Sequence, residues 1–138
     1  MSVLITGSIA YDAVFSFAGA FGEQITRPVE PGFNTTFLTR AMRRDFGGCA
    51  GNIAYSLKLL GGEPVIMATV GEDAAPYLKR LDDLGLSREH VRPVANSYTA
   101  QAFITTDLDD NQITAFHPGA MVHSHLNKVE HTQGVTLG

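Results

Sequence analysis

The sequence predicts an α/β protein built on a parallel sheet. Two short apolar runs, residues 3–6 and 64–70, are typical of buried strands. The segment between them carries apolar residues at helical spacing, namely Ala50, Ile53, Ala54, Leu57 and Leu60. A strand, a helix and a second strand in this order form a βαβ unit, which places the two strands parallel in one sheet.

Glycines mark both ends of the predicted helix over residues 51–60. Gly61 and Gly62 stop it, while Gly47 and Gly48 precede it. A glycine pair at a helix start lets the backbone approach a ligand closely and presents unpaired N–H groups to it. The alternative is a tight strand-to-helix turn without a ligand.

The remaining elements follow in order. A second helix is expected from Asp73, as its cap, to Gly85, with Pro76 in the first turn, and a short strand near residues 91–94. Residues 99–106 and 112–117 flank a polar turn and predict a half-exposed β-hairpin. Residues 13–18 and 34–38 predict short strands outside the main sheet, which could pair with the hairpin over Asp12. Residues 134–138 look like the start of another strand.

Composition narrows the class of protein. The 138 residues are 44% apolar and 17% charged, which is typical of a globular chain. The net charge of −4 gives no basic surface for nucleic acid. There is no basic secretory leader and no apolar run near the roughly 20 residues that a membrane span requires. The single Cys49 suits a reducing compartment, so a cytoplasmic protein is expected.

A spaced signature runs through the centre of the chain. It begins with Gly47-Gly48 and continues through Ala50, Asn52, Ala54, Gly61 and Gly71. This pattern resembles the first signature of the ribokinase-like (PfkB-type) family of sugar and nucleoside kinases, with every spacing met. Residues 3–12 are similar to the family's opening strand and its substrate-binding aspartate, and residues 111–120 to its second lid strand and the segment after it. Bacterial adenosine-kinase-like sugar kinases look closest.

The resemblance implies a fold and an activity. The fold is ribokinase-like: a partial parallel sheet with helices on both faces, incomplete at the C-terminus, plus a small β-sheet lid. Residues 1–138 would be the N-terminal part of one kinase domain, with lid strands at roughly 13–40 and 99–117. Family members transfer the γ-phosphoryl group of ATP to a hydroxymethyl group of a sugar or nucleoside. Asp12 would accept hydrogen bonds from vicinal hydroxyls, Asn52 would bind the same hydroxyls, and Gly47 and Gly48 would leave room for the sugar.

Departures from the family pattern refine this expectation. Ala10-Tyr11-Asp12 and Pro118-Gly119-Ala120-Met121 make the pocket less polar than a free-ribose site, which favours an adenosine-like nucleoside or a substituted sugar. The family's Gly-x-Gly-Asp and Asn-x-x-Glu motifs are absent from residues 1–138. ATP and Mg²⁺ are therefore expected for a longer parent protein, with no site for either here, and this chain alone should be inactive. A homodimer formed through the lid is a further expectation.

Two other interpretations stay open for the whole chain: a non-catalytic sugar- or nucleoside-binding module, or an inactive truncated fragment. Asp12 could be a solvated turn residue, and Asn52 could bond only to the local backbone. Cys49 is expected to be a small packed residue. The histidines of residues 117–131 are expected on the surface, with a metal site as the lesser alternative. Phe103 and Phe116 are expected to pack on a strand face, with stacking on a base as the alternative.

Overall fold

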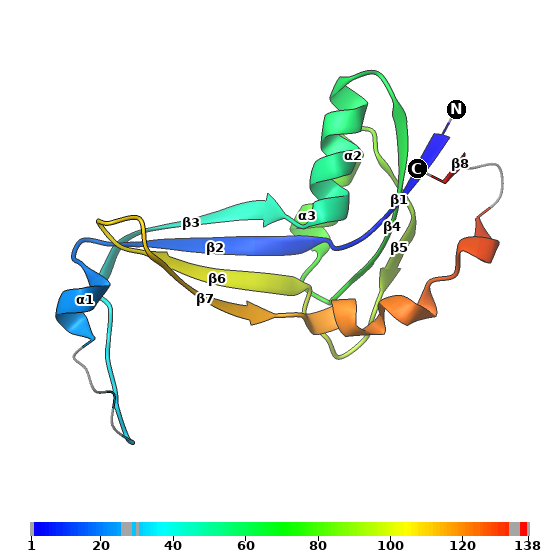
Figure 1. Ribbon diagram of the computed structural model, residues 1–138. Coiled ribbons are helices and arrows are strands. Elements are labelled where there is room, and N and C mark those ends of the chain that lie inside the picture. Colours follow the sequence, from blue (N-terminus) through cyan, green and yellow to red (C-terminus); the bar gives the residue numbers. More distant parts are fainter. Residues whose placement is uncertain (1, 26–28, 30, 133–135, 138) are drawn as a thin grey trace.

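Figure 1 shows the computed structural model, which describes residues 2–25, 29, 31–132 and 136–137. The chain forms two sheets. A parallel sheet contains β1 (Ser2–Thr6), β4 (Glu63–Val70), β5 (Ser87–Pro93) and β8 (Thr136–Leu137). A second sheet, the lid, contains β2 (Ala10–Phe17), β3 (Thr39–Gly47), β6 (Ala100–Thr106) and β7 (Gln112–His117). The lid extends away from the parallel sheet as a long arm (Figure 1).

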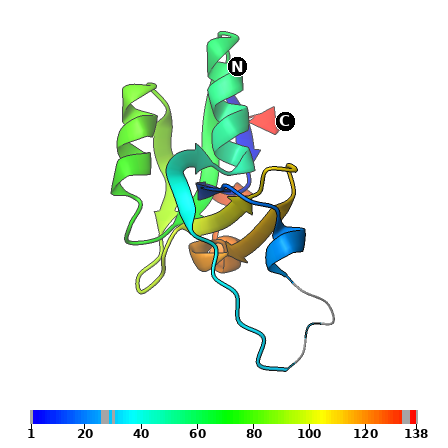
Figure 2. The same cartoon turned by 90° about the vertical axis from the view of Figure 1, so that its left-hand side faces the viewer.

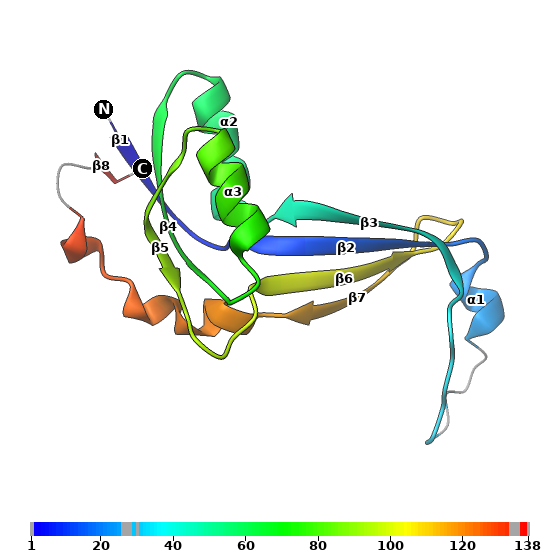
Figure 3. The same cartoon turned by 180° about the vertical axis from the view of Figure 1, so that it is seen from behind.

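The parallel sheet has the order β5-β4-β1-β8. Helices α2 (Cys49–Leu59) and α3 (Ala75–Asp83) stand next to each other against it (Figures 2 and 3). Alternate residues of β4 enter the core beneath the helices, so Met67 and Thr69 point to the other face. On that side Met67 and the 3₁₀ helix η1 (Gly119–Leu126) line one pocket. The core is made by Ile5, Ile66, Ala68, Val70, Ala50, Ala54, Tyr77 and Leu81.

The predicted βαβ unit is confirmed, and the new strand at residues 136–137 pairs in parallel with β1. Residues 134, 135 and 138 of that predicted strand lie outside the described residues. None of the described helices is long and apolar enough to cross a membrane. The short helices α1 (Phe21–Gln24) and η2 (Val129–His131) complete the fold.

The lid sheet has the order β3-β2-β6-β7, with β2 and β6 parallel in its centre. The predicted hairpin is confirmed as β6 and β7. The strand expected at residues 34–38 is wrong, because the partner of β2 is β3, which begins at Thr39. Most of β3 is exposed and carries charged residues on both faces, so no apolar alternation marks it in the sequence.

Two expectations about the helices are also corrected. Ile53 and Leu60 do not belong to the buried face of α2, since they are 53% and 85% exposed. The helix approaches the sheet through small residues instead, chiefly Ala50 and Ala54. Asp73 does not cap α3, which begins after Ala74 without a side-chain cap.

Asp73 joins the lid to the parallel sheet instead. Its carboxylate accepts hydrogen bonds from the backbone N–H of Thr99 (2.7 Å) and from Gln101 Nε2 (3.2 Å). A guanidinium nitrogen of Arg44 lies 3.9 Å away, and the Tyr11 hydroxyl donates to the Asp73 carbonyl at 3.1 Å. Strands β2, β3 and β6 are therefore all tied to the segment that leads into α3.

Candidate functional site

Asp12 lies in the lid, where it is the third residue of β2. The sequence placed it just past the end of the first strand, but β1 ends at Thr6 and a short turn separates the two strands. Its half-buried carboxylate lies against the α-carbon of Gly47 in the neighbouring strand. A Cβ on Gly47 would lie 2.7 Å from Asp12 Cγ and closer still to Oδ2. Gly47 therefore leaves the space that the Asp12 carboxylate occupies.

The electrostatic setting of Asp12 disfavours its charge. Burial raises the pKa of the Asp12 carboxyl, and the carboxylate of Asp45, its cross-strand partner, raises that pKa further. Asp45 is itself engaged by Arg43, whose Nε lies 2.7 Å from its Oδ2. Hydroxyl groups that donate hydrogen bonds to the Asp12 carboxylate would stabilise its charged form.

Gly48 and Ser8 together form the start of α2. Gly48 precedes the helix with φ +92°, and a Cβ there would lie 2.8 Å from the backbone nitrogen of Ala10. Ser8 caps the helix from across the fold: its Oγ accepts from the N–H of Cys49 (3.1 Å) and its carbonyl accepts from the N–H of Ala50 (3.0 Å). The expectation that this helix start offers unpaired N–H groups is wrong for these two.

Tyr77, on α3, holds the backbone of Gly47 in place. Its hydroxyl donates to the carbonyl of Gly47 at 2.7 Å, and burial raises its pKa to about 12. Gly51 leaves the room for this hydroxyl, because a Cβ on Gly51 would collide with it. The position of Gly47, and with it the space beside Asp12, is thus set by α3.

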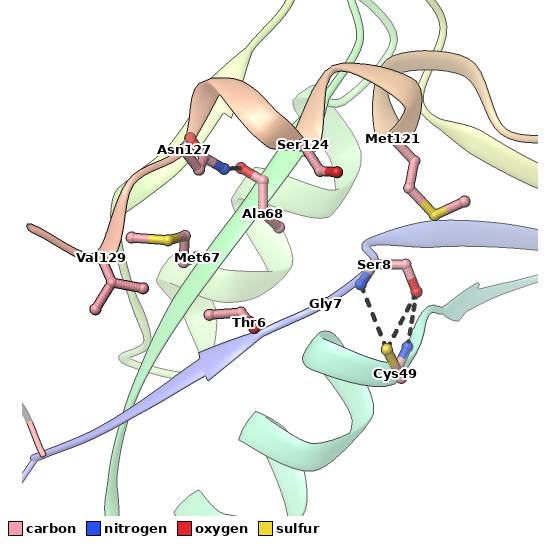
Figure 4. A pocket seen from close by; sticks show the side chains of 10 residues that line it. All are labelled: Thr6, Gly7, Ser8, Cys49, Met67, Ala68, Met121, Ser124, Asn127 and Val129. Carbon is pink, nitrogen blue, oxygen red and sulfur yellow. Dashed lines mark hydrogen bonds between the residues drawn. The ribbon is translucent and has the colours of Figure 1, made fainter. Parts of the chain in front are cut away.

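A hollow of about 640 Å³ opens where β1 and β4 end (Figure 4). Cys49 lines it, exposed and not packed as expected. The hydroxyl and N–H of Ser8, each 3.4 Å from Cys49 Sγ, lower the pKa of the thiol. Sequence reasoning missed Ser8, which lies 41 positions away with no local signal. The lining residues are Thr6, Gly7, Ser8, Cys49, Met67, Ala68, Met121, Ser124, Asn127 and Val129.

Asn52 lies elsewhere. It is exposed on α2 and lines a second hollow, of about 850 Å³, between that helix and β1. Ile53, Ser56 and Leu57 line the same hollow. The structure therefore brings Asp12, Gly47 and Gly48 together at the joint of lid and helix, while Asn52 faces a separate space.

Phe103 and Phe116 are less buried than expected. Phe103 is 42% exposed and Phe116 is 53% exposed. For Phe116 the reason is that its strand, β7, is an edge strand exposed along its whole length, whereas Phe103 lies in the inner strand β6. The sequence favoured packing on a strand face for both rings, but both are substantially exposed in the lid.

Metal-binding groups are sparse. Among residues 2–25, 29, 31–132 and 136–137, no three His, Cys, Asp or Glu side chains form a group that could hold a metal ion. His123 and His125 lie in η1 with ring centroids 6.2 Å apart.

Comparisons with known proteins agree with this geometry. Burkholderia thailandensis nucleoside kinase, solved with inosine, is 54% identical; the match covers 98% of this chain and 42% of that one, with a TM-score of 0.80. A nucleoside kinase of Methanocaldococcus jannaschii is 30% identical over 88% of this chain and 37% of that protein. Cryptococcus neoformans ribokinase, 23% identical over 86% of this chain and 35% of that one, shares the fold with a TM-score of 0.69.

This chain thus spans well under half the length of these relatives. The family model for the pfkB family carbohydrate kinases matches residues 20–133. That match includes β3, α2, β4, α3 and the β6–β7 hairpin. The chain belongs to the pfkB family of carbohydrate kinases, with the ribokinase-like fold.

Proposed function

We propose that this chain forms the substrate-binding part and the lid of a kinase that phosphorylates the hydroxymethyl group of a nucleoside, with adenosine-like purine nucleosides favoured. The observation that carries the proposal is the half-buried carboxylate of Asp12, held beside Gly47 on one face of the lid. The 54% identity to a nucleoside kinase solved with inosine supports a nucleoside over a free sugar.

Asp12 acts as the acceptor for the two vicinal hydroxyls of the sugar. A carboxylate has two oxygens that accept and no donor, so it can accept a hydrogen bond from each of the two hydroxyls at once. Burial and Asp45 raise its pKa, which means that the charged carboxylate is destabilised in the free site. Hydrogen bonds from the substrate hydroxyls offset this destabilisation on binding. The gain from each hydrogen bond to this charged group is about 1.5–3 kcal/mol.

The glycines and Asn52 have supporting roles in this proposal. Gly47 holds open the space of the Asp12 carboxylate, and Gly48 turns the chain sharply from β3 into α2. The substrate lies against this backbone. Asn52, one turn further along α2, faces the hollow beside β1; we keep it as a second substrate contact, which requires that the bound sugar extends from Asp12 to that side of α2.

The transfer itself uses parts of a longer protein. The phosphoryl donor is ATP, and bound Mg²⁺ would neutralise charge on its phosphates. The ATP site and the catalytic base lie outside this chain in our proposal, because the relatives are more than twice as long. The share of this chain is to bind the sugar, to orient its hydroxymethyl group and to exclude water with the lid.

The outer face of the lid suits a homodimer. Register places Met42 and Ile113 in one row across the sheet and Phe103 in the row beside it, all on the face opposite Asp12. These side chains are 62%, 42% and 42% exposed. A second copy of the lid would cover this apolar surface, and sedimentation of the wild type against Met42→Lys checks it.

The experiment is a kinase assay on the intact gene product that contains this sequence, with ATP and a panel of adenosine, inosine, ribose and fructose. Phosphorylation of the nucleosides, lost in Asp12→Asn, is expected. Binding of nucleosides without phosphoryl transfer would favour the non-catalytic module. Absence of both, with poor amide protection across residues 3–70, would indicate an inactive fragment.

A further inference from the structure

The face of the lid behind Asp12 packs against α3, which stands at the root of β2 and β3 (Figure 3). Tyr11 precedes Asp12 in β2 and pairs with Phe46 in β3, so both rings project from the face opposite the Asp12 carboxylate. Tyr77 of α3 meets both rings edge-on, with its ring centroid 5.8 Å from that of Tyr11 and 5.2 Å from that of Phe46. Tyr77 is 2% exposed, so this contact belongs to the core.

Two hydrogen bonds give this contact a defined geometry. The Tyr77 hydroxyl donates to the Gly47 carbonyl in β3 at 2.7 Å. The backbone N–H of Tyr77 donates to the Tyr11 hydroxyl at 3.3 Å, and that hydroxyl donates in turn to the Asp73 carbonyl at 3.1 Å. One residue of α3 thus holds β2 through its main chain and β3 through its side chain.

The fold makes room for the Tyr77 hydroxyl at the expense of a helix residue. Gly51 lies in α2, although glycine is a poor helix former. A Cβ on Gly51 would collide with the Tyr77 hydroxyl oxygen first, while the ring carbon Cζ would be 3.1 Å away. The space at Gly51 therefore serves the hydroxyl above all, and the hydrogen bond to Gly47 is what that hydroxyl makes.

The spacing of β2 and β3 at this point decides how the Asp12 carboxylate is held. The three atoms nearest to a Cβ on Gly47 all belong to that carboxylate. A shift of Gly47 would therefore move the wall beside the carboxylate and turn its two oxygens. Hydrogen bonds weaken steeply when they are misaligned, and a misplacement of about 1 Å can lower a rate by about 100-fold.

We propose that Tyr77 and Tyr11 are positioning residues, which fix β3 against β2 at the spacing where the Asp12 carboxylate accepts from both substrate hydroxyls. This inference rests on the proposed function. Neither tyrosine touches the substrate, because both rings lie behind the strands that carry Asp12 and Gly47. Their effect should therefore be confined to substrates that carry the vicinal hydroxyls. Weakening one hydrogen bond to a charged group predicts a fall of about 10-fold in kcat/KM.

The test is Tyr77→Phe in the intact gene product, since this change removes the hydroxyl and keeps the ring. The readout is kcat/KM for inosine relative to 2′,3′-dideoxyinosine, which lacks both vicinal hydroxyls. Tyr77→Phe should lower this ratio by about 10-fold, mainly through a higher KM for inosine, and Tyr11→Phe should lower it in the same direction. The matched control is Tyr55→Phe, the same change in an α2 residue that is 37% exposed, and it should leave the ratio unchanged.

A second variant displaces the same hydroxyl without changing Tyr77. Gly51→Ala should lower the ratio in the wild type, because its Cβ pushes the hydroxyl from Gly47, and should add little in Tyr77→Phe, where that oxygen is gone. Urea unfolding of each variant checks that it remains folded. Equal effects of Gly51→Ala in both backgrounds would contradict the inference.

The outcomes separate the inference from the proposed function. An unchanged ratio in Tyr77→Phe, or an equal fall for both compounds, overturns the inference, since the hydroxyl would then serve stability alone. In Asp12→Ala no carboxylate remains to be positioned, so a further fall of the ratio on adding Tyr77→Phe also overturns it. A wild type that does not phosphorylate inosine overturns the proposed function itself.

Discussion

Replacing Gly47 by alanine tests whether this glycine exists to make room for the Asp12 carboxylate. The three atoms nearest to a Cβ at Gly47 all belong to Asp12. The Cβ would lie 2.7 Å from Asp12 Cγ, about 0.7 Å short of ordinary contact at 3.4 Å. Either the carboxylate or the strand must therefore move in Gly47→Ala.

The magnitude follows from what the displaced carboxylate loses. A hydrogen bond to a charged group is worth about 1.5–3 kcal/mol, which corresponds to a loss of about 10- to 150-fold in kcat/KM for each bond broken. A misplacement of about 1 Å in a positioned group is enough to cause a loss of this size. We expect Gly47→Ala to lower kcat/KM for inosine by that factor.

The assay is steady-state phosphorylation of inosine by the intact gene product, with urea unfolding of the same variants. Gly22→Ala is the matched control, since a Cβ on Gly22 meets no atom within 4 Å. In the Asp12→Ala background the collision is gone, so Gly47→Ala should no longer destabilise the protein there. Full activity of Gly47→Ala, or equal destabilisation in both backgrounds, would refute the reasoning.

Three further changes probe the surroundings of the site. Burial, and then the charge of Asp45, raise the pKa of Asp12, so nucleoside binding should weaken as the pH falls through that raised pKa. In calorimetric titrations, Asp45→Asn should move this loss of affinity to lower pH. If the loss stays at the same pH, Asp45 does not act on Asp12 in this way. Asp73→Ala removes two hydrogen bonds to a carboxylate and should lower the free energy of unfolding in urea by at least about 1.5–3 kcal/mol, the contribution of one such bond. An unchanged midpoint would show that the joint is not held there. Ser8→Ala removes the hydroxyl hydrogen bond that contributes most to the lowered thiol pKa of Cys49, while the backbone N–H contact stays. Iodoacetamide should therefore alkylate the thiol more slowly at about pH 7.5, and an equal rate argues against that role.

The parallel sheet and its helices were predictable because their signals are local. Apolar runs identified β1 and β4, helical spacing identified α2, and Gly85, at φ +64°, ended α3 as expected. The strand β3 was not predictable, since its exposed, charged residues carry no alternation. Its position depends on pairing with β2, which is a property of the fold and not of the segment.

The site was predictable only in part. The spaced glycine signature indicated Gly47 and Gly48 as candidates, and the opening strand indicated Asp12, but neither showed that Asp12 belongs to the lid. The capping of α2 by Ser8 and the contacts of Asp73 with the lid join residues 26 to 62 positions apart. Such long-range hydrogen bonds leave no pattern in one sequence, so only the folded structure shows them.

The proposed role of Asp12 is to bind the vicinal hydroxyls of a nucleoside. A double-mutant cycle tests it: kcat/KM is measured for inosine and 2′,3′-dideoxyinosine, with the wild-type intact gene product and with Asp12→Ala. Both compounds keep the hydroxymethyl group that accepts the phosphoryl group. We expect the wild type to prefer inosine by at least about 10-fold and Asp12→Ala to lose this preference. A preference that survives in Asp12→Ala would contradict it.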